Sequence, residues 1–411
     1  MRIVFALHGY KPAWNVGGPI VSVSALAESL VRRGHEVTVV TSNSNLTVNL
    51  EVPTDTPVDV AGVTVYYFEH DELLRRLVPL PAYFSKSIGF LYSKRIRPRL
   101  DQLVPQADIV HTHLPFNYPT YASAQAAFRH GKPLIYHQRG VLDPARLSFR
   151  SLKKALYLHL VEKPILHRAD TLIALTEAER DSYRRLGIET RCSVIPNGVD
   201  STEYSGTYDP REVAKLGIRD NQVVILFMGR VHPIKGVDLL LDAFISLRQR
   251  VTDAVLVIAG PDEFGLQAKF DEQVRRANVA GGVIFVGMVQ GETKRQLLLR
   301  ADVFCLPSVA EGFSIAVLEA LAASTAVLLS PGCNFPDVVA ARAGRICERS
   351  VDAIESNLEA MLTNRDELRA MGLRGRELVE SKFAWDSIVE RMLEVYERAV
   401  RSRGCRSQDK K

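Results

Sequence analysis

Cysteines are few in this chain, and long apolar runs are absent from it. The cysteines are Cys192, Cys305, Cys333, Cys347 and Cys405. An odd, scattered set without a C-x-x-C pair is typical of reduced cytoplasmic thiols rather than of a disulfide framework. No apolar run approaches the roughly 18 residues of a membrane-spanning helix. The stretch 1–10 has only a short apolar part before a glycine-containing loop, which favours a first strand over a signal peptide.

Strong charge bias and metal-binding motifs are also missing. The formal net charge is +5 over 411 residues, which is too mild to indicate nucleic-acid binding. No D-x-D motif occurs, so we expect no metal-held diphosphate and no cofactor. His111 and His113 could form a pair of metal ligands, but the sequence offers no third ligand at a suitable spacing. Either histidine could equally be a satisfied residue at the end of a strand.

Short apolar runs alternate with helical patterns along the whole chain. The hydrophobic fraction of 46% supports full cores, and the length suits two domains. The alternation predicts an α/β protein with two Rossmann-like domains, each built on a parallel sheet. We expect strands at 3–7, 36–41, 64–68, 108–113, 133–137, 171–175, 222–228, 254–259, 283–286, 301–306 and 326–330.

The strand pattern is interrupted once, after a turn at 194–200. The polar stretch 201–220 that follows is interpreted as a linker. We therefore predict an N-terminal domain at 1–198, a C-terminal domain at 199–382, a final helix at 383–401 and a disordered tail at 402–411. Two parallel sheets joined in this way imply a ligand cleft between their carboxyl ends.

Two basic amphipathic segments, 73–100 and 148–167, each allow two interpretations. Segment 73–100 has no acidic residue and interleaves lysines and arginines with aromatic side chains. It is either a helix pair with a basic outer face or a patch for an anionic, lipid-linked acceptor at the inner membrane surface. Its prolines favour the first interpretation.

Two carboxylates, Glu311 and Glu319, stand eight residues apart in a stretch of small and apolar residues. If a helix begins directly after Glu311, they lie roughly 10 Å apart along its axis, too far for an acid–base pair on one bond. They suit hydroxyl groups at the two ends of a ligand, with an anion between them at the free amides of Phe313, Ser314 and Ile315. Either glutamate could be an ordinary helix charge, but an unpaired carboxylate among apolar residues is costly.

Two further loops could hold an anion. Arg230 and Lys235 lie five residues apart between the first strand and the first helix of the second domain. A guanidinium fork and an ammonium can converge there on one diphosphate. The same sequence would also fit two ordinary surface cations. In the first domain, Gly17 and Gly18 precede a helix whose N-terminus suits an anion, or they form a plain turn.

Together these motifs resemble the retaining glycosyltransferases of family 4, which have the GT-B fold. The resemblance rests on the E-x7-E of Glu311 and Glu319, GRVHPIKG at 229–236, GGP at 17–19, IPNGVD at 195–200 and FAW at 383–385. It implies a cytoplasmic, metal-independent hexosyltransferase that acts in exopolysaccharide, capsule or glycoconjugate synthesis. The donor would be a UDP-sugar or GDP-sugar bound by the second domain, and the acceptor a saccharide or lipid-linked molecule bound by the first. The final helix would pack back on the first domain.

The resemblance also implies roles for the charged candidates. Arg230 and Lys235 would grip the diphosphate, Glu311 would face the donor sugar, and Glu319 the ribose. His137, at a strand end of the first domain, would touch the sugar near the reacting carbon. The reaction would retain the anomeric configuration through an oxocarbenium-like state, and the departing phosphate would help to deprotonate the acceptor.

Backbone groups would supply further substrate contacts. They belong to Gly17, Gly18, Phe313, Ser314, Ile315 and, near the base, Val289. The loop HQRGVLDP at 137–144 is similar to the PRGML-type loop of some bacterial polysaccharide glycosyltransferases, with Gln138 in place of the proline. Arg139 in this loop would meet an anionic acceptor or simply pin the loop.

Three alternatives on the same fold remain open. One is a nucleotide-sugar epimerase or hydrolase, the second a soluble sugar-phosphate synthase, and the third a catalytically silent sugar-nucleotide sensor. A sensor need not keep all four charged residues of the second domain, so their presence argues against that alternative.

Overall fold

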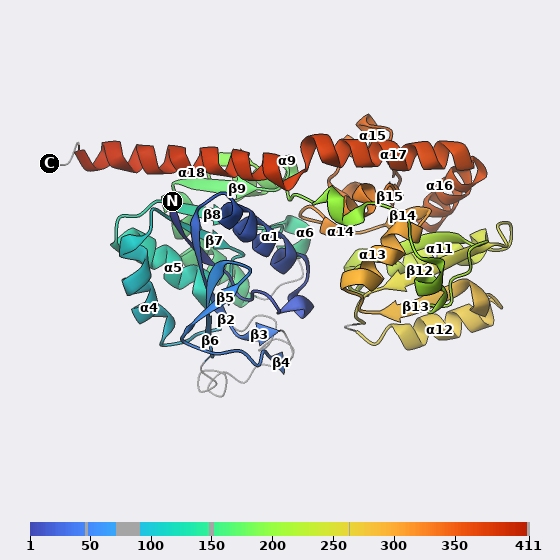
Figure 1. Ribbon diagram of the computed structural model, residues 1–411, viewed down its shortest axis with the longest axis horizontal. Helices are drawn as coiled ribbons and strands as arrows, with labels where there is room; N and C mark the ends of the chain where they lie inside the picture. Colours follow the sequence, from blue (N-terminus) through green and yellow to red (C-terminus); the bar gives the residue numbers. More distant parts are fainter. Residues whose placement is uncertain (46–47, 71–90, 148–151, 263, 409–411) are drawn as a thin grey trace. The chain divides into compact units, whose positions relative to one another are not determined.

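The computed structural model describes residues 1–45, 48–70, 91–147, 152–262 and 264–408. The chain forms two compact units (Figure 1). Unit 1 comprises Met1–Asn197 and Trp385–Lys411, and unit 2 comprises Gly198–Ala384. The chain therefore passes from one unit to the other twice.

Unit 1 is built on an eight-stranded sheet with the order β10-β9-β8-β7-β1-β2-β6-β5. Neighbouring strands are parallel except for the β5–β6 pair. The six strands expected in this half are present, and β5 and the short β10 are additional. The edge strand β5 carries little hydrophobic signal because its side chains are partly exposed. The strands are β1 (Arg2–Ala6), β2 (Glu36–Ser42), β5 (Pro57–Val60), β6 (Val63–Phe68), β7 (Ile109–His113), β8 (Leu134–His137), β9 (Thr171–Ala174) and β10 (Cys192–Val194), beside a short hairpin of β3 (Ser44–Asn45) and β4 (Val48–Asn49).

Helices cover both faces of this sheet. On one face, α1 (Gly18–Arg32) and α18 (Trp385–Gln408) lie side by side and share a hydrophobic core with the strands (Figure 1). The opposite face has a second core, to which α4, α5, α8 and α9 contribute. The helices other than α1 and α18 are α4 (Ile96–Leu103), α5 (Tyr118–Arg129), α6 (Pro144–Leu147), α7 (Leu152–Tyr157), α8 (Lys163–Arg168) and α9 (Glu177–Arg185).

The last helix of the chain, α18, returns to unit 1, as the sequence predicted. It continues to Gln408, so the disordered tail expected from residue 402 was wrong over 402–408. Two contacts support this end of the helix. Glu397 pairs with Arg401 at 2.7 Å, and the Arg403 guanidinium binds both carboxylate oxygens of Asp170, at 2.8 and 3.0 Å.

Unit 2 is built on a six-stranded parallel sheet with the order β13-β12-β11-β14-β15-β16. The five strands expected in this half are present, and the short β16 is additional. Because β11 and β14 are neighbours, the loops that leave their carboxyl ends start side by side. The strands are β11 (Val223–Met228), β12 (Ala254–Ala259), β13 (Val283–Gly287), β14 (Val303–Leu306), β15 (Ala326–Leu329) and β16 (Gly344–Ile346).

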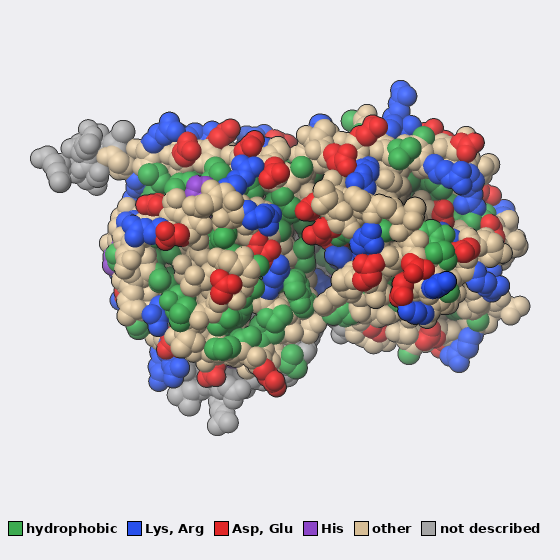
Figure 2. Space-filling model, viewed as in Figure 1, with side chains coloured by type: hydrophobic (Ala, Val, Ile, Leu, Met, Phe, Trp, Pro, Cys, Tyr) green, Lys and Arg blue, Asp and Glu red, His purple; other side chains and the backbone are tan. Residues whose placement is uncertain are grey.

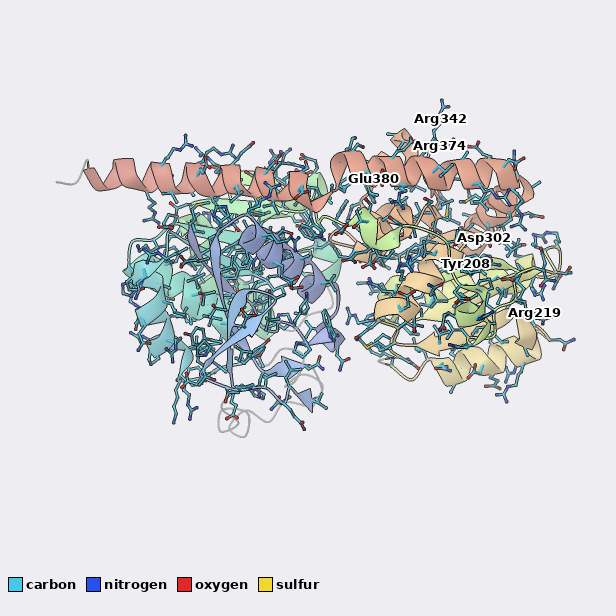
Figure 3. The ribbon with its side chains drawn as sticks, in the orientation of Figure 1. Tyr208, Arg219, Asp302, Arg342, Arg374 and Glu380 are labelled. Carbon is cyan, nitrogen blue, oxygen red and sulfur yellow. The ribbon has the colours of Figure 1, made fainter. Side chains whose placement is uncertain are left out.

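The helices of unit 2 pack around this sheet and against one another (Figure 3). On α17, for example, Arg374 donates a 2.8 Å hydrogen bond to the carbonyl of Arg342. The helices are α10 (Pro210–Ala214), α11 (Val237–Leu247), α12 (Gln267–Arg276), α13 (Gly291–Arg300), α14 (Ile315–Ala322), α15 (Asp337–Ala340), α16 (Val351–Thr363) and α17 (Arg365–Lys382).

The polar stretch 201–220 is not the linker that its composition suggested. It forms a 3₁₀ turn, Ser201–Tyr204, and α10, and both pack on α13 in unit 2. Arg300 of α13 pairs with Asp302 at 3.0 Å and stacks on Tyr208 at 5.3 Å (Figure 3). Polar residues can look like a linker when a few specific contacts, rather than a broad apolar face, hold them.

The two basic segments have different outcomes. Most of segment 73–100 lies outside the described residues. Segment 148–167 is not one continuous α-helix: a π-helical turn, Leu158–Glu162, joins α7 to α8, and Pro164 follows it. Cations and anions are interspersed on the face in Figure 2. Among the described helices, none combines the length and apolarity needed to cross a bilayer.

Candidate functional site

Two loops at the carboxyl edge of the unit 2 sheet carry the predicted diphosphate-binding residues. The loop after β11 runs through Arg230 and Lys235 to α11, and the loop after β14 leads to Glu311 and α14. The amide of Val309 donates to the carbonyl of Ile234 at 2.7 Å. This main-chain hydrogen bond connects the two loops.

Gly236 permits this close approach. It has a φ of +71°, and a Cβ atom at this position would lie 2.3 Å from the carbonyl oxygen of Pro307. Any side chain would strain the backbone and push the two loops apart. The final glycine of GRVHPIKG is thus required by the packing of the loops.

The structure brings Lys235 and Glu311 into direct contact. The Nζ atom of Lys235 lies 2.5 Å from a carboxylate oxygen of Glu311, and the side chains are only 14% and 7% exposed. The backbone of Glu311 is held as well, because its amide donates to Gly332 and its carbonyl accepts from Asn334. Lys235, predicted to bind the diphosphate, and Glu311, predicted to face the donor sugar, therefore neutralise each other here.

Helix α14 begins later than expected. Its N-cap is Ser314 and its first residue is Ile315, so Glu319 is the fifth helical residue, and the helix does not begin directly after Glu311. No side chain caps this end, and the amides of the first turn have no carbonyl of their own helix to bond. An anion at this terminus would therefore meet Ile315 and the two residues after it. Phe313 instead packs in an aromatic group with Phe335 at 4.7 Å.

Glu319 is buried and paired. Its carboxylate accepts a 2.6 Å bond from Nζ of Lys294, and its side chain is 8% exposed. The Tyr204 hydroxyl also bonds it, and burial together with this carboxylate raises the pKa of Tyr204. Lys294 and Tyr204 were missed by sequence reasoning, because each is one ordinary residue in a short polar segment.

The other predicted unit 2 residues lie in the loops around this pair of ion pairs. Arg230 is half-buried and stands at the start of the β11 loop, where the next amide, that of Val231, donates to Pro261. Val289 is half-buried in the loop between β13 and α13, two residues before the helix that carries Lys294. Lys294, the partner of Glu319, is the fourth residue of that helix, so it lies at the same end of α13 as Val289.

In unit 1, His137 ends β8 beside the two histidines of β7. His113 is its register partner across the strands, and His111 lies two residues earlier in β7. All three side chains are fully buried, and burial, with the nearby Arg139 charge, lowers their pKa values well below 6.5. They are therefore neutral at physiological pH.

These histidines overturn the argument that a metal would lack a third ligand. His137 supplies one, since a ring nitrogen from each of the three lies within 4.8 Å of the others. The spacing along the sequence hid this because the third residue comes from the adjacent strand. However, the Arg139 guanidinium donates to His113 at 3.3 Å, and a fixed positive charge disfavours a second cation there.

Arg139 is itself buried and lies in a positive-φ turn, with φ of +51°. Its Nη1 donates to Ser22 Oγ at 2.7 Å and to Asn197 Oδ1 at 3.1 Å. Ser22 belongs to α1, and Asn197 is the last residue of unit 1 before the chain leaves it. Burial lowers the pKa of Arg139 to about 10, so it remains a cation.

Gly17 and Gly18 stand where the sequence placed them, at the start of α1. Gly17 is the N-cap with a φ of +95°, and Gly18 is the first helical residue. A Cβ atom built on either glycine would meet nothing within 4 Å. The space at this helix terminus is therefore open to a ligand group within unit 1.

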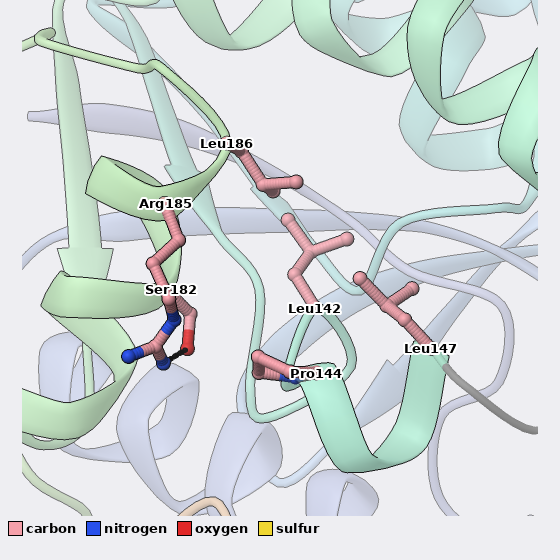
Figure 4. Close-up of a pocket in the computed structure, with 6 residues that line it drawn as sticks. All are labelled: Leu142, Pro144, Leu147, Ser182, Arg185 and Leu186. Carbon is pink, nitrogen blue, oxygen red and sulfur yellow. Dashed lines mark hydrogen bonds between the residues drawn. The ribbon is translucent and has the colours of Figure 1, made fainter.

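An apolar depression of about 480 Å³ lies on unit 1 beside the residues that follow Arg139 in the chain (Figure 4). Leu142 and Pro144, just after Arg139, line one side, and Leu186 and Arg185 of the α9 end line the other. The Arg185 guanidinium bonds Ser182 at 3.0 Å, so it turns along the helix. The depression contains none of the residues predicted from the motifs.

Comparisons with known proteins agree with this architecture. The Glycosyltransferase Family 4 model matches residues 16–203, and the Glycosyl transferases group 1 model matches residues 209–378. The chain is 28% identical to a D-inositol 3-phosphate glycosyltransferase of Gordonia bronchialis, over 96% of this chain and 87% of that one. It is 32% identical to an alpha-maltose-1-phosphate synthase of Mycolicibacterium smegmatis, over 57% of this chain and 65% of that one.

Solved structures show the same fold. Anabaena HepE in complex with UDP superposes with a TM-score of 0.74 at 19% identity, covering 97% of this chain and all of that one. Its likeness confirms the GT-B fold that the family resemblance implied. Two family models that between them span most of the chain, on this fold, show that the protein belongs to the group 1 glycosyltransferases of family 4.

Proposed function

We propose that this glycosyltransferase moves a hexose from a nucleoside diphosphate sugar to an acceptor hydroxyl, with retention of the anomeric configuration. The observation that carries the proposal is two ion pairs with buried carboxylates on either side of the α14 N-terminus, Lys235–Glu311 and Lys294–Glu319. The carboxylates are buried and the lysines are partly buried. The desolvation cost of such pairs can exceed their Coulombic gain, so stability alone does not account for them. A ligand with hydroxyl groups at both ends and a diphosphate between them fits this layout.

In this proposal the ligand takes over contacts that the side chains now make with each other. A diphosphate would bind Lys235, Arg230 and the first amides of α14, since an uncapped helix N-terminus and cations both favour anions. Glu311, released from Lys235, would accept hydrogen bonds from hydroxyls of the donor sugar. Glu319 would do the same for the ribose while Lys294 keeps it ionised and in place.

The proposed retention of configuration without an enzyme nucleophile is supported by the positions of Glu311 and Glu319, which do not form a nucleophile–acid pair. Retaining hydrolases place a nucleophilic and an acidic carboxyl about 5 Å apart. Here each glutamate has its own lysine partner, and the two stand on different segments, Glu311 in the loop after β14 and Glu319 in α14. We therefore assign the base to the departing phosphate, with no enzyme nucleophile. The neutral His137 would contact the sugar as a hydrogen-bonding group.

The donor and acceptor classes draw support from relatives. HepE was solved in complex with UDP and with UDP-glucose, which supports a UDP-sugar, with a GDP-sugar as the other candidate. The names of two relatives contain a sugar or inositol phosphate. We propose a saccharide or lipid-linked acceptor used in exopolysaccharide, capsule or other glycoconjugate synthesis, on the cytoplasmic side of the membrane with peripheral contact to its surface.

A direct assay tests the proposal. The purified chain is titrated calorimetrically with UDP, GDP and ADP, and the tightest nucleotide selects the sugar donors to be assayed with mixed acceptors. We expect nucleotide release coupled to a new glycosidic bond whose anomeric configuration matches that of the donor. Nucleotide release without an acceptor product would indicate a hydrolase, and an inverted product would reject retention.

A further inference from the structure

We propose that Arg139 and the histidines beside it form a buried anion-binding subsite in unit 1, which takes the phosphate or carboxylate of a charged sugar acceptor. Naming the ligand as an acceptor rests on the proposed function. The binding of an anion rests only on the geometry described below, and it can be measured without any turnover.

The first observation is a buried cation without an anionic partner. Arg139 is only 6% exposed, and its hydrogen bonds go to Ser22 Oγ, Asn197 Oδ1 and His113 Nδ1, all of them neutral groups. In the described part of the chain no carboxylate forms an ion pair with it. Glu179 contributes a favourable field, but its carboxylate accepts the amide of Leu175 at 2.8 Å. A buried charge with only dipolar partners is costly.

The second observation is a set of buried ring nitrogens without partners. Both nitrogens of His137, and Nε2 of His113 and His111, are enclosed and bond to nothing in the described residues. Most buried polar atoms in proteins have a hydrogen-bond partner. Each neutral imidazole carries one N–H donor, so this group can offer donors to an anion.

The third observation concerns access. Nη2 of Arg139 makes no hydrogen bond to a described residue, and it is not among the polar atoms that the fold encloses completely. Ser22, which binds the same guanidinium, lies one helical turn from Gly18, where the N-terminus of α1 faces open space. The guanidinium of Arg139 therefore contacts α1 only one helical turn after the open N-terminus of that helix.

Charge decides between an anion and a metal ion at this place. A divalent cation between the three histidines would add its charge to a guanidinium that already contacts His113 at 3.3 Å. An anion would instead compensate the guanidinium and accept the histidine N–H groups. The distances between the histidine nitrogens would suit a metal ion, but the positive charge of Arg139 favours an anion at the same place.

Inorganic phosphate is the first probe. It is titrated at constant ionic strength, with chloride replaced, into the full chain carrying Lys235→Ala, so that the unit 2 loop does not account for binding. The signals of ¹³Cε1-labelled histidines are followed by NMR, and His137→Gln assigns one of them. We expect saturable shifts of His113 and His137. Signals that stay unchanged up to the solubility of phosphate would overturn the subsite.

Substitutions then locate the charge. Arg139→Gln should weaken phosphate binding about tenfold or more, because a charge-assisted hydrogen bond to a buried group is lost, and Arg139→Lys should keep part of the affinity. Arg191→Gln removes an exposed cation from the same unit and should change nothing. Undiminished binding by a folded Arg139→Gln variant would refute the role of Arg139. If that variant does not fold, the titration of the Lys235→Ala chain still decides.

Two further probes identify the source of the anion. Glucose 1-phosphate and glucuronate carry the two anionic groups, and methyl glucoside is the neutral control, which should not shift the histidines. Phosphate binding without sugar transfer would reject the proposed function and keep the subsite. Transfer to neutral acceptors with unshifted histidines would keep the function and reject the subsite.

Discussion

The hydroxyl of Tyr396 lies 2.7 Å from Nδ1 of His111, a residue 285 positions away in the sequence. Tyr396 belongs to α18 and His111 to β7, and both side chains are fully buried. This hydrogen bond fixes the orientation of the His111 ring, because its other nitrogen has no partner among the described residues. The helix that closes the chain therefore holds the first member of the histidine group in place.

We expect Tyr396→Phe to lower the free energy of unfolding of unit 1 by about 1–2 kcal/mol, since it leaves a buried ring nitrogen unpaired. Urea unfolding followed by circular dichroism measures this loss. Tyr208→Phe is the matched control, because its hydroxyl makes only a 3.4 Å contact with Asp220. Equal effects of the two substitutions would show that the His111 bond contributes nothing specific.

Lys235→Ala should abolish sugar transfer while the protein stays folded, because the diphosphate loses its ammonium partner. Transfer rates with a saturating donor and the unfolding curve test the two parts of this expectation. Lys215→Ala removes an exposed lysine that pairs with Glu212 on the surface, and it should leave both unchanged. A wild-type rate in Lys235→Ala would remove Lys235 from the donor site.

Glu319→Ala should mainly raise the donor KM, by about tenfold or more, since a charge-assisted hydrogen bond is typically worth 1.5–3 kcal/mol. Lys294→Met should act in the same direction, because it leaves the buried Glu319 carboxylate without its cation. Steady-state kinetics with varied donor separate KM from kcat. An unchanged KM in Glu319→Ala would show that this carboxylate makes no contact with the donor.

Stability should fall as the solution is acidified below pH 6.5. Burial lowers the pKa of His111, His113 and His137 well below that value, and the pKa of His8 to about 4. The unfolded chain therefore binds more protons than the folded one below pH 6.5, and each such group costs up to about 1.4 kcal/mol per pH unit.

Urea unfolding at pH 7.5 and at pH 5.5 measures this dependence. His137→Gln should reduce the slope by roughly one proton, because one depressed group is removed. His159→Gln is the control, since this histidine is exposed. A wild-type free energy that stays constant between the two pH values would contradict the buried, neutral state of the group.

EDTA should leave sugar transfer unchanged, since lysines, an arginine and helix amides are the groups assigned to the diphosphate. The assay compares initial rates after dialysis with and without EDTA, and with magnesium restored. Loss of activity on chelation and its recovery with magnesium would assign the diphosphate to a metal instead.

Much of the unit 2 site could be read from the chain because its parts are local. The Lys235 loop is continuous with β11, and Glu311 stands directly after β14, so strand patterning alone placed both at one sheet edge. The exact start of α14 could not be predicted, since Ser314 lacks a side-chain capping bond. A helix whose start carries no capping signal can shift by a turn without any change in the sequence pattern.

Local sequence patterns determined the alternation of strands and helices, the two sheets, and which residues follow the carboxyl ends of the strands. They could do so because hydrophobic periodicity and turn residues act over a few positions. Only the tertiary structure decided which charges meet. Lys294 reaches Glu319, Arg139 reaches Ser22 and Asn197, and Tyr396 reaches His111. These partners come from different elements brought together by packing, and no local pattern encodes such long-range proximity.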